Sequence, residues 1–130
     1  MRHVVTRAPS FPGVAPDTLL EALPDQVWQV VCGDGGHWRA GIYSPSASAR
    51  EHLQELERHD CPELFLLMRG RVILVVSDEG RVREIELQQG KPMLISAPHT
   101  GYCPDGPHTG AAFVVERDCF DTEYRGVAEW

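Results

Sequence analysis

The short segment ERHDCPE contains the densest group of chemically reactive side chains in this chain. It places Glu57, His59, Cys61 and Glu63 at alternate positions. Alternate residues of an extended strand point to the same side, so these groups could converge on one ligand. Imidazole, carboxylate and thiolate all bind first-row divalent metals, and an imidazole beside a carboxylate can also move a proton near neutral pH. Because Pro62 interrupts regular strand pairing, the alternative interpretation is a hydrated strand edge.

A second group of such side chains follows Pro98, and it contains His99, Cys103, Asp105 and His108. An imidazole beside a thiol can favour the nucleophilic thiolate. No helix N-terminus and no recognised catalytic signature accompanies these residues. A cysteine nucleophile is therefore the less favoured hypothesis for this loop.

The elements that must position these groups are short strands. Runs rich in β-branched, aromatic and other apolar residues are separated by turns that contain glycine, and they lie at residues 26–32, 37–43, 64–76, 81–87, 92–97 and 110–116. The longest run bends around Gly70 and predicts two strands. Segment 47–58 is ambiguous, and we expect helix or loop there. Seven or so short strands without a long amphipathic helix predict a β-sandwich or β-barrel.

The N-terminal residues have a different pattern from the rest of the chain. Pro9, Pro12 and Pro16 predict an extended arm, because proline cannot donate a backbone hydrogen bond. Asp17 is placed as the N-cap of a short helix that Pro24 would end. We therefore expect residues 1–25 to be an arm with a short helix and residues 26–130 to be one β-barrel domain.

The composition narrows the classes of function. With 130 residues, 42% of them hydrophobic and 24% charged, the chain is long enough to bury one core. Its net charge of -7 argues against a nucleic-acid partner, because phosphate binding requires clustered basic residues. No apolar run is long enough for a signal peptide or a membrane span, so we expect a cytoplasmic protein whose four cysteines are free thiols.

The spacing of three residues resembles the first motif of the cupin superfamily. His59, Glu63 and Gly70 stand where that motif has a histidine, a glutamate after three intervening residues, and a glycine after six more. The family's other histidine, two residues earlier, is replaced by Glu57, and its leading glycine is replaced by Glu51. The resemblance extends over roughly residues 38–117.

A second cupin motif is matched less completely. Gly90 and Pro98 fit its frame, and its metal-binding histidine then falls on Cys103. His99 and His108 lie close enough in sequence to take that place after a small shift of register. The resemblance thus implies a metal site of His59 and Glu63 with Cys103, His99 or His108.

The resemblance implies an all-β, cupin-type jelly-roll β-barrel that binds a small molecule. The function we favour is a metal-dependent enzyme of the dioxygenase, isomerase or lyase type, which acts on a small polar metabolite with Fe, Mn, Ni or Zn. His59 and Glu57 are the candidate catalytic residues, and Glu57 serves as a ligand or general base. A homodimer is expected, because edge strands and the proline-rich arm could pair with a second copy.

Two alternatives remain open at the level of sequence. One is a metal-free sugar isomerase or epimerase, in which His59 is the base. The other is a non-catalytic binding or sensing module, which the incomplete ligand set would suit. Whether the chain is an enzyme is therefore left undecided by its residues.

Overall fold

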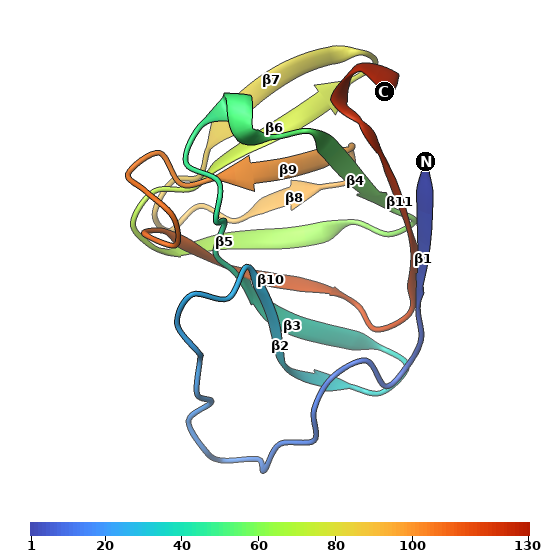
Figure 1. Ribbon diagram of the computed structural model, residues 1–130. Helices are drawn as coiled ribbons and strands as arrows, with labels where there is room; N and C mark the ends of the chain where they lie inside the picture. Colours follow the sequence, from blue (N-terminus) through green and yellow to red (C-terminus); the bar gives the residue numbers. More distant parts are fainter.

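The computed structural model describes residues 1–130 as two antiparallel β-sheets packed face to face (Figure 1). One sheet has six strands, in the order β1 (Arg2–Thr6), β11 (Phe120–Gly126), β4 (Glu55–His59), β9 (His99–Tyr102), β6 (Ile73–Asp78) and β7 (Arg81–Glu86). The other has five, in the order β2 (Trp28–Asp34), β3 (Trp38–Tyr43), β10 (Ala111–Arg117), β5 (Glu63–Arg69) and β8 (Met93–Ile95). The predicted all-β class is confirmed.

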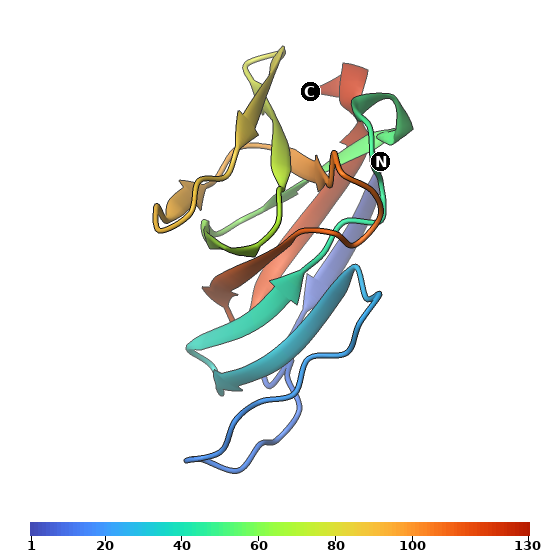
Figure 2. The ribbon, with the colours of Figure 1, turned by 90° about the vertical axis from the view of Figure 1, so that its left-hand side faces the viewer.

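The sheets remain two separate layers, so the expected closed barrel is corrected to a sandwich. No strand of one sheet is hydrogen-bonded to a strand of the other. From β3 onward the chain changes sheet at nearly every connection, and only the hairpin β6–β7 stays within one sheet. Figure 2 shows the two layers with a long excursion of the chain between β1 and β2. Residues close in sequence therefore face each other across the interior.

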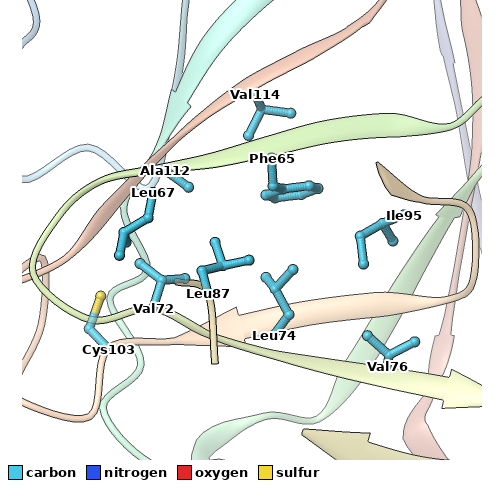
Figure 3. Close-up of a cluster of buried hydrophobic side chains, with 10 residues drawn as sticks. All are labelled: Phe65, Leu67, Val72, Leu74, Val76, Leu87, Ile95, Cys103, Ala112 and Val114. Atoms are coloured by element: carbon cyan, nitrogen blue, oxygen red, sulfur yellow. The ribbon is translucent and has the colours of Figure 1, made fainter. Parts of the chain in front are cut away.

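Apolar side chains fill one end of the space between the sheets. Along β5 the residues are alternately buried and exposed, as expected for a strand with one face toward a core. The main core cluster consists of Phe65, Leu67, Val72, Leu74, Val76, Leu87, Ile95, Cys103, Ala112 and Val114. Figure 3 shows the side chains of β5 and β10 facing those of β6 across the interior. Their burial supplies the main driving force that holds the sheets together.

The short helix expected after Asp17 does not form. Asp17 has a φ of 63°, which a helix N-cap does not adopt, and residues 18–23 are exposed. The side chain of Gln29 accepts a hydrogen bond from the backbone N–H of Leu23 at 2.9 Å and donates one to its carbonyl at 2.8 Å. These bonds attach the segment to the second residue of β2. A helix of one or two turns has too few internal bonds to form without packing, and here nothing packs on it.

Several strands were not predicted from the sequence. Arg2–Thr6, expected as an unpaired arm, forms β1 and pairs along its full length with β11. Segment 47–58 contains a 3-10 turn, η1 (Arg50–His52), followed by most of strand β4. A second turn, η2 (Val127–Glu129), ends the chain, and no helix in the structure could span a membrane. The division of the chain at residue 25 stays a prediction.

The outer face of the five-stranded sheet leaves several large apolar side chains in contact with solvent. Leu64, Leu66 and Met68 of β5 and Leu94 of β8 are all exposed. The strand register places Leu64 directly opposite Leu94. The homodimer expected from the sequence stays a prediction.

Gly70, where the sequence predicted a bend, connects β5 to β6 with a φ of +61°. A Cβ atom there would lie 2.2 Å from the carbonyl oxygen of Thr109, a backbone atom that cannot rotate away. Gly90 has a similar φ of +75°, but no atom lies within 4 Å of its Cβ position. Alanine substitutions at the two positions can therefore distinguish the cost of backbone strain from that of steric overlap.

We predict that Gly90→Ala lowers the free energy of unfolding by about 1–2 kcal/mol, the cost of a left-handed conformation for an L residue. Gly70→Ala should cost about 1–3 kcal/mol more, because the neighbouring strand connection must also move. Urea denaturation of both variants measures the difference. Equal losses would contradict the close approach of Thr109.

Candidate functional site

A cavity of about 300 Å³ lies between the sheets, beside the apolar core. Half of its sixteen lining residues are hydrophobic, and Phe65 and Val114 belong both to its wall and to the core. Its charged or ionisable acid, imidazole and guanidinium groups are Arg39, Glu57, His59, Glu63, His99 and Glu116. The sandwich therefore has an apolar end and an end that gathers polar groups.

Both sheets contribute side chains to this polar end of the cavity. Glu57 and His59 alternate on β4, and Glu57 is the antiparallel partner of His99 on β9. Glu63 begins β5 in the opposite sheet, after the chain has crossed through Pro62. The sequence suggested a single row on one strand, but the crossover brings Glu63 to face the histidines instead.

The carboxylate of Glu63 lies between the two imidazole rings. Its Oε2 atom is 2.7 Å from Nε2 of His99 and 3.2 Å from Nε2 of His59. Glu57 is more distant, with its Oε1 atom 4.0 Å from Nε2 of His59. The side chains of Glu63, His59 and His99 are almost completely shielded from water, whereas that of Glu57 is 31% exposed.

The second nitrogen of each imidazole has its own partner. Nδ1 of His99 donates to the carbonyl oxygen of Ala97 at 2.9 Å, and Nδ1 of His59 lies 2.7 Å from the hydroxyl of Thr122. A neutral His99 therefore carries its lone pair on Nε2, which faces Glu63. Two lone pairs at 2.7 Å repel unless a proton or a cation lies between them.

The buried Oε2 atom of Glu63 and Nε2 of His99 have no well-oriented hydrogen bond, despite their short separation. Two sets of three side chains could each hold a metal ion, because the possible ligand atoms within each set all lie within 4.8 Å of one another. One set is Glu57, His59 and His99, and the other is His59, Glu63 and Glu116. Imidazole nitrogens and carboxylate oxygens are the donors that Fe, Mn, Ni and Zn use in proteins. The residues present thus fit a divalent metal ion.

Without a metal, these groups stabilise one another's charges. Burial opposes a charge on His99, but the close contact with the Glu63 carboxylate and the negative charge of Glu63 prevail and raise the pKa of His99 to about 9. The pKa of His59 is also raised, since Glu63 and Glu57 outweigh the effect of burial. Burial alone would raise the pKa of Glu63, yet the two imidazoles hold it far below its usual range.

Two lining residues that the sequence analysis missed form a buried ion pair. On the five-stranded sheet, Nε of Arg39 on β3 donates to Oε1 of Glu116 on β10 at 2.7 Å, and Nη2 of Arg39 lies 2.7 Å from the same oxygen. Burial, and then the charge of Glu63, raise the pKa of Glu116 to about 7, although Arg39 opposes them. The sequence could have indicated Glu116, because it follows Val114 by two residues and so lies on the same, inward-facing side of the strand.

The predicted site residues divide into two groups. His59, Glu57, Glu63 and His99 meet in the cavity. Cys103 instead is fully buried in the apolar core, where burial raises its pKa, and Cys61 does not line the cavity. The remaining candidate, His108, contacts the carbonyl of Ser44 outside the cavity.

Comparison with known proteins gives one partial sequence match and several similar folds. No protein-family model matches the chain. It is 37% identical over 62 residues to a 3-hydroxyanthranilate 3,4-dioxygenase of Cupriavidus pinatubonensis, a match that covers 45% of this chain and 32% of the dioxygenase. An RmlC-like cupin of Methanocaldococcus jannaschii with a double-stranded β-helix fold aligns with a TM-score of 0.54 and 11% identity, over 80% of this chain and 93% of that one.

An epoxidase has a similar structure as well. Hydroxypropylphosphonic acid epoxidase from S. wedmorenis, in complex with fosfomycin, aligns with a TM-score of 0.54 and 15% identity, over 82% of this chain and 58% of the epoxidase. The chain therefore spans about a third of the matched dioxygenase and less than two thirds of the epoxidase. At these identities the structural matches establish a common fold.

We predict that Arg39→Met destabilises the protein by about 3–5 kcal/mol, because it leaves the Glu116 carboxylate buried without its partner. The double variant Arg39→Met with Glu116→Leu should recover most of this loss, since no buried charge then remains. Urea denaturation of both variants is the measurement. A double variant as unstable as the single one would show that the ion pair is not the cause.

Proposed function

We propose that the chain is a member of the cupin superfamily, whose fold it shares, and that it is a metal-dependent enzyme acting on a small molecule. One observation supports this most directly. The buried Oε2 atom of Glu63 and Nε2 of His99 converge in the cavity without a well-oriented hydrogen bond, next to a second imidazole. Buried polar atoms without a partner are costly unless a cation or a proton lies between them.

The proposed ligands are His59 and His99 through Nε2, and Glu63 through its carboxylate. Glu57 is the fourth ligand, and it takes the place where the first cupin motif has another histidine. Cys103 is not in this set, because it lies in the apolar core. A divalent ion held there supplies a Lewis acid that polarises an oxygen atom of the substrate.

The chain's own residues have distinct tasks around this centre. The carbonyl of Ala97 and the hydroxyl of Thr122 orient the two imidazoles through their Nδ1 atoms. Glu116, which Arg39 holds within 4.8 Å of the donor atoms of His59 and Glu63, takes a proton from the substrate or returns it. Its pKa of about 7 suits a group that must act in both directions.

We predict that the purified protein, stripped with a chelator, binds about one equivalent of Zn²⁺ or Mn²⁺ in isothermal titration calorimetry. Glu63→Gln and His99→Asn should each weaken this binding by about 100-fold or more, because each removes a donor. His52→Asn is the matched control, since His52 is exposed on η1 and outside the cavity.

Absence of stoichiometric binding in the native protein would refute the metal-dependent function. In that case, turnover lost in His59→Asn would favour the metal-free isomerase or epimerase. Thermal stabilisation by metabolites without turnover would instead favour a binding or sensing module.

Metal binding should strengthen with pH. His99, with a pKa of about 9 in the metal-free protein, carries a proton at neutral pH that must leave before Nε2 can bind a metal. The apparent affinity should therefore rise up to about tenfold per pH unit between pH 6.5 and 9, and then level off. Calorimetry at pH 7 in two buffers of different ionisation enthalpy should detect the released proton. An affinity independent of pH over this range would contradict the protonated state of His99.

A further inference from the structure

The charges in the cavity bear on which substrates it can hold, on the premise of the metal-dependent function proposed above. Its acidic groups are Glu57, Glu63 and Glu116, and its only lysine or arginine is Arg39. A substrate with a carboxylate or phosphate would need a cationic side chain free to pair with it, because a buried anion without a partner is strongly unfavourable. Arg39 is the side chain to consider for that task.

Each of the three guanidinium nitrogens of Arg39 already has a partner in the protein. Its Nε and Nη2 atoms contact Glu116, and its Nη1 atom donates to the hydroxyl of Ser10 at 3.1 Å. Its planar group also lies 4.9 Å from the ring centroid of Phe120 and 5.7 Å from that of Trp28. These contacts hold the guanidinium in place through its nitrogens and through two aromatic rings.

The charges of the proposed centre balance before any substrate arrives. Glu57 and Glu63 contribute two negative charges, which a divalent ion neutralises, and the ionised form of Glu116 pairs its charge with that of Arg39. Glu57 matters here, because a histidine in its place would leave the metal centre with one positive charge more. An additional anionic group therefore meets no uncompensated positive charge.

The rest of the wall suits an apolar molecule of small size. Trp28, Phe65 and Phe120 line the cavity, together with Val27 and Val114. A volume of about 300 Å³ is equivalent to about ten water molecules in the liquid and lies at the lower limit for ligand pockets. The space admits a single small ring or a short branched chain.

We propose that the substrate is a small molecule with an apolar or aromatic body that is uncharged or cationic outside the atoms that bind the metal. Carboxylate, phosphate and phosphonate groups on that body are excluded, because the positive charges of the metal ion and Arg39 are already compensated by the glutamates of the wall. The site thus selects its substrate by rejecting anions as well as by size.

Three hydroxamates of the same shape test this selection, since each binds the metal through the same two oxygens. We would titrate the zinc-loaded, full-length protein with benzohydroxamate, 4-(aminomethyl)benzohydroxamate and 4-carboxybenzohydroxamate in a calorimeter. The first two should bind at least about tenfold more tightly than the carboxylate, which must lose water without gaining a partner.

A new positive charge in the wall should change this preference. Val27→Lys adds an ammonium group at a lining position that is 45% exposed, so we expect it to fold. It should bring the affinity for 4-carboxybenzohydroxamate to that of benzohydroxamate or above it. Val14→Lys, at a position that is 44% exposed and outside the cavity, is the matched control and should keep the native preference.

The outcomes separate this proposal from the function on which it rests. Failure of zinc to bind would overturn the proposed function and this inference with it. Zinc binding with equal or tighter binding of the carboxylate probe, or with no binding of any probe, would overturn the substrate class alone.

Discussion

The interaction on which the site depends is the contact of one buried carboxylate with two imidazoles across the sandwich. Glu63 extends from the five-stranded sheet, whereas His59 and His99 belong to the six-stranded sheet. The apolar core fixes the spacing of the sheets and thereby that of these donors, because close-packed side chains leave little freedom for the layers to shift. An electrostatic cluster is thus positioned by apolar packing at the other end of the same interior.

A second polar network connects the cavity to the N-terminal excursion. Ser10 accepts a hydrogen bond from Arg39, and its hydroxyl and backbone N–H both donate to the buried Asp118. Asp118 also accepts from the backbone of Gly36, in the turn between β2 and β3. Because Arg39 is fixed in this way, the orientation of Glu116 depends on the excursion, although its residues are distant in sequence.

Agreement between sequence and structure was best where one physical signal dominates. Runs of β-branched, aromatic and other apolar residues predicted strands such as β5 and β10, and the bend at Gly70 was predicted from its position between two such runs. The prediction was wrong for the helix after Asp17, because helix signals act only when the segment has something to pack against. The first strand, β1, was missed because its pairing partner is at the opposite end of the chain.

The sequence by itself determined the all-β class, and it identified His59 and Glu63 as residues that share a motif. Only the tertiary structure decided which group joins them: it brought His99 into the cavity and placed Cys103 in the apolar core. The spacing of residues in the sequence cannot show whether His99 or Cys103 enters the cavity, because a shift of one residue along a strand turns a side chain to the opposite face of the sheet. That register is set by pairing between β9 and the distant strands β4 and β6.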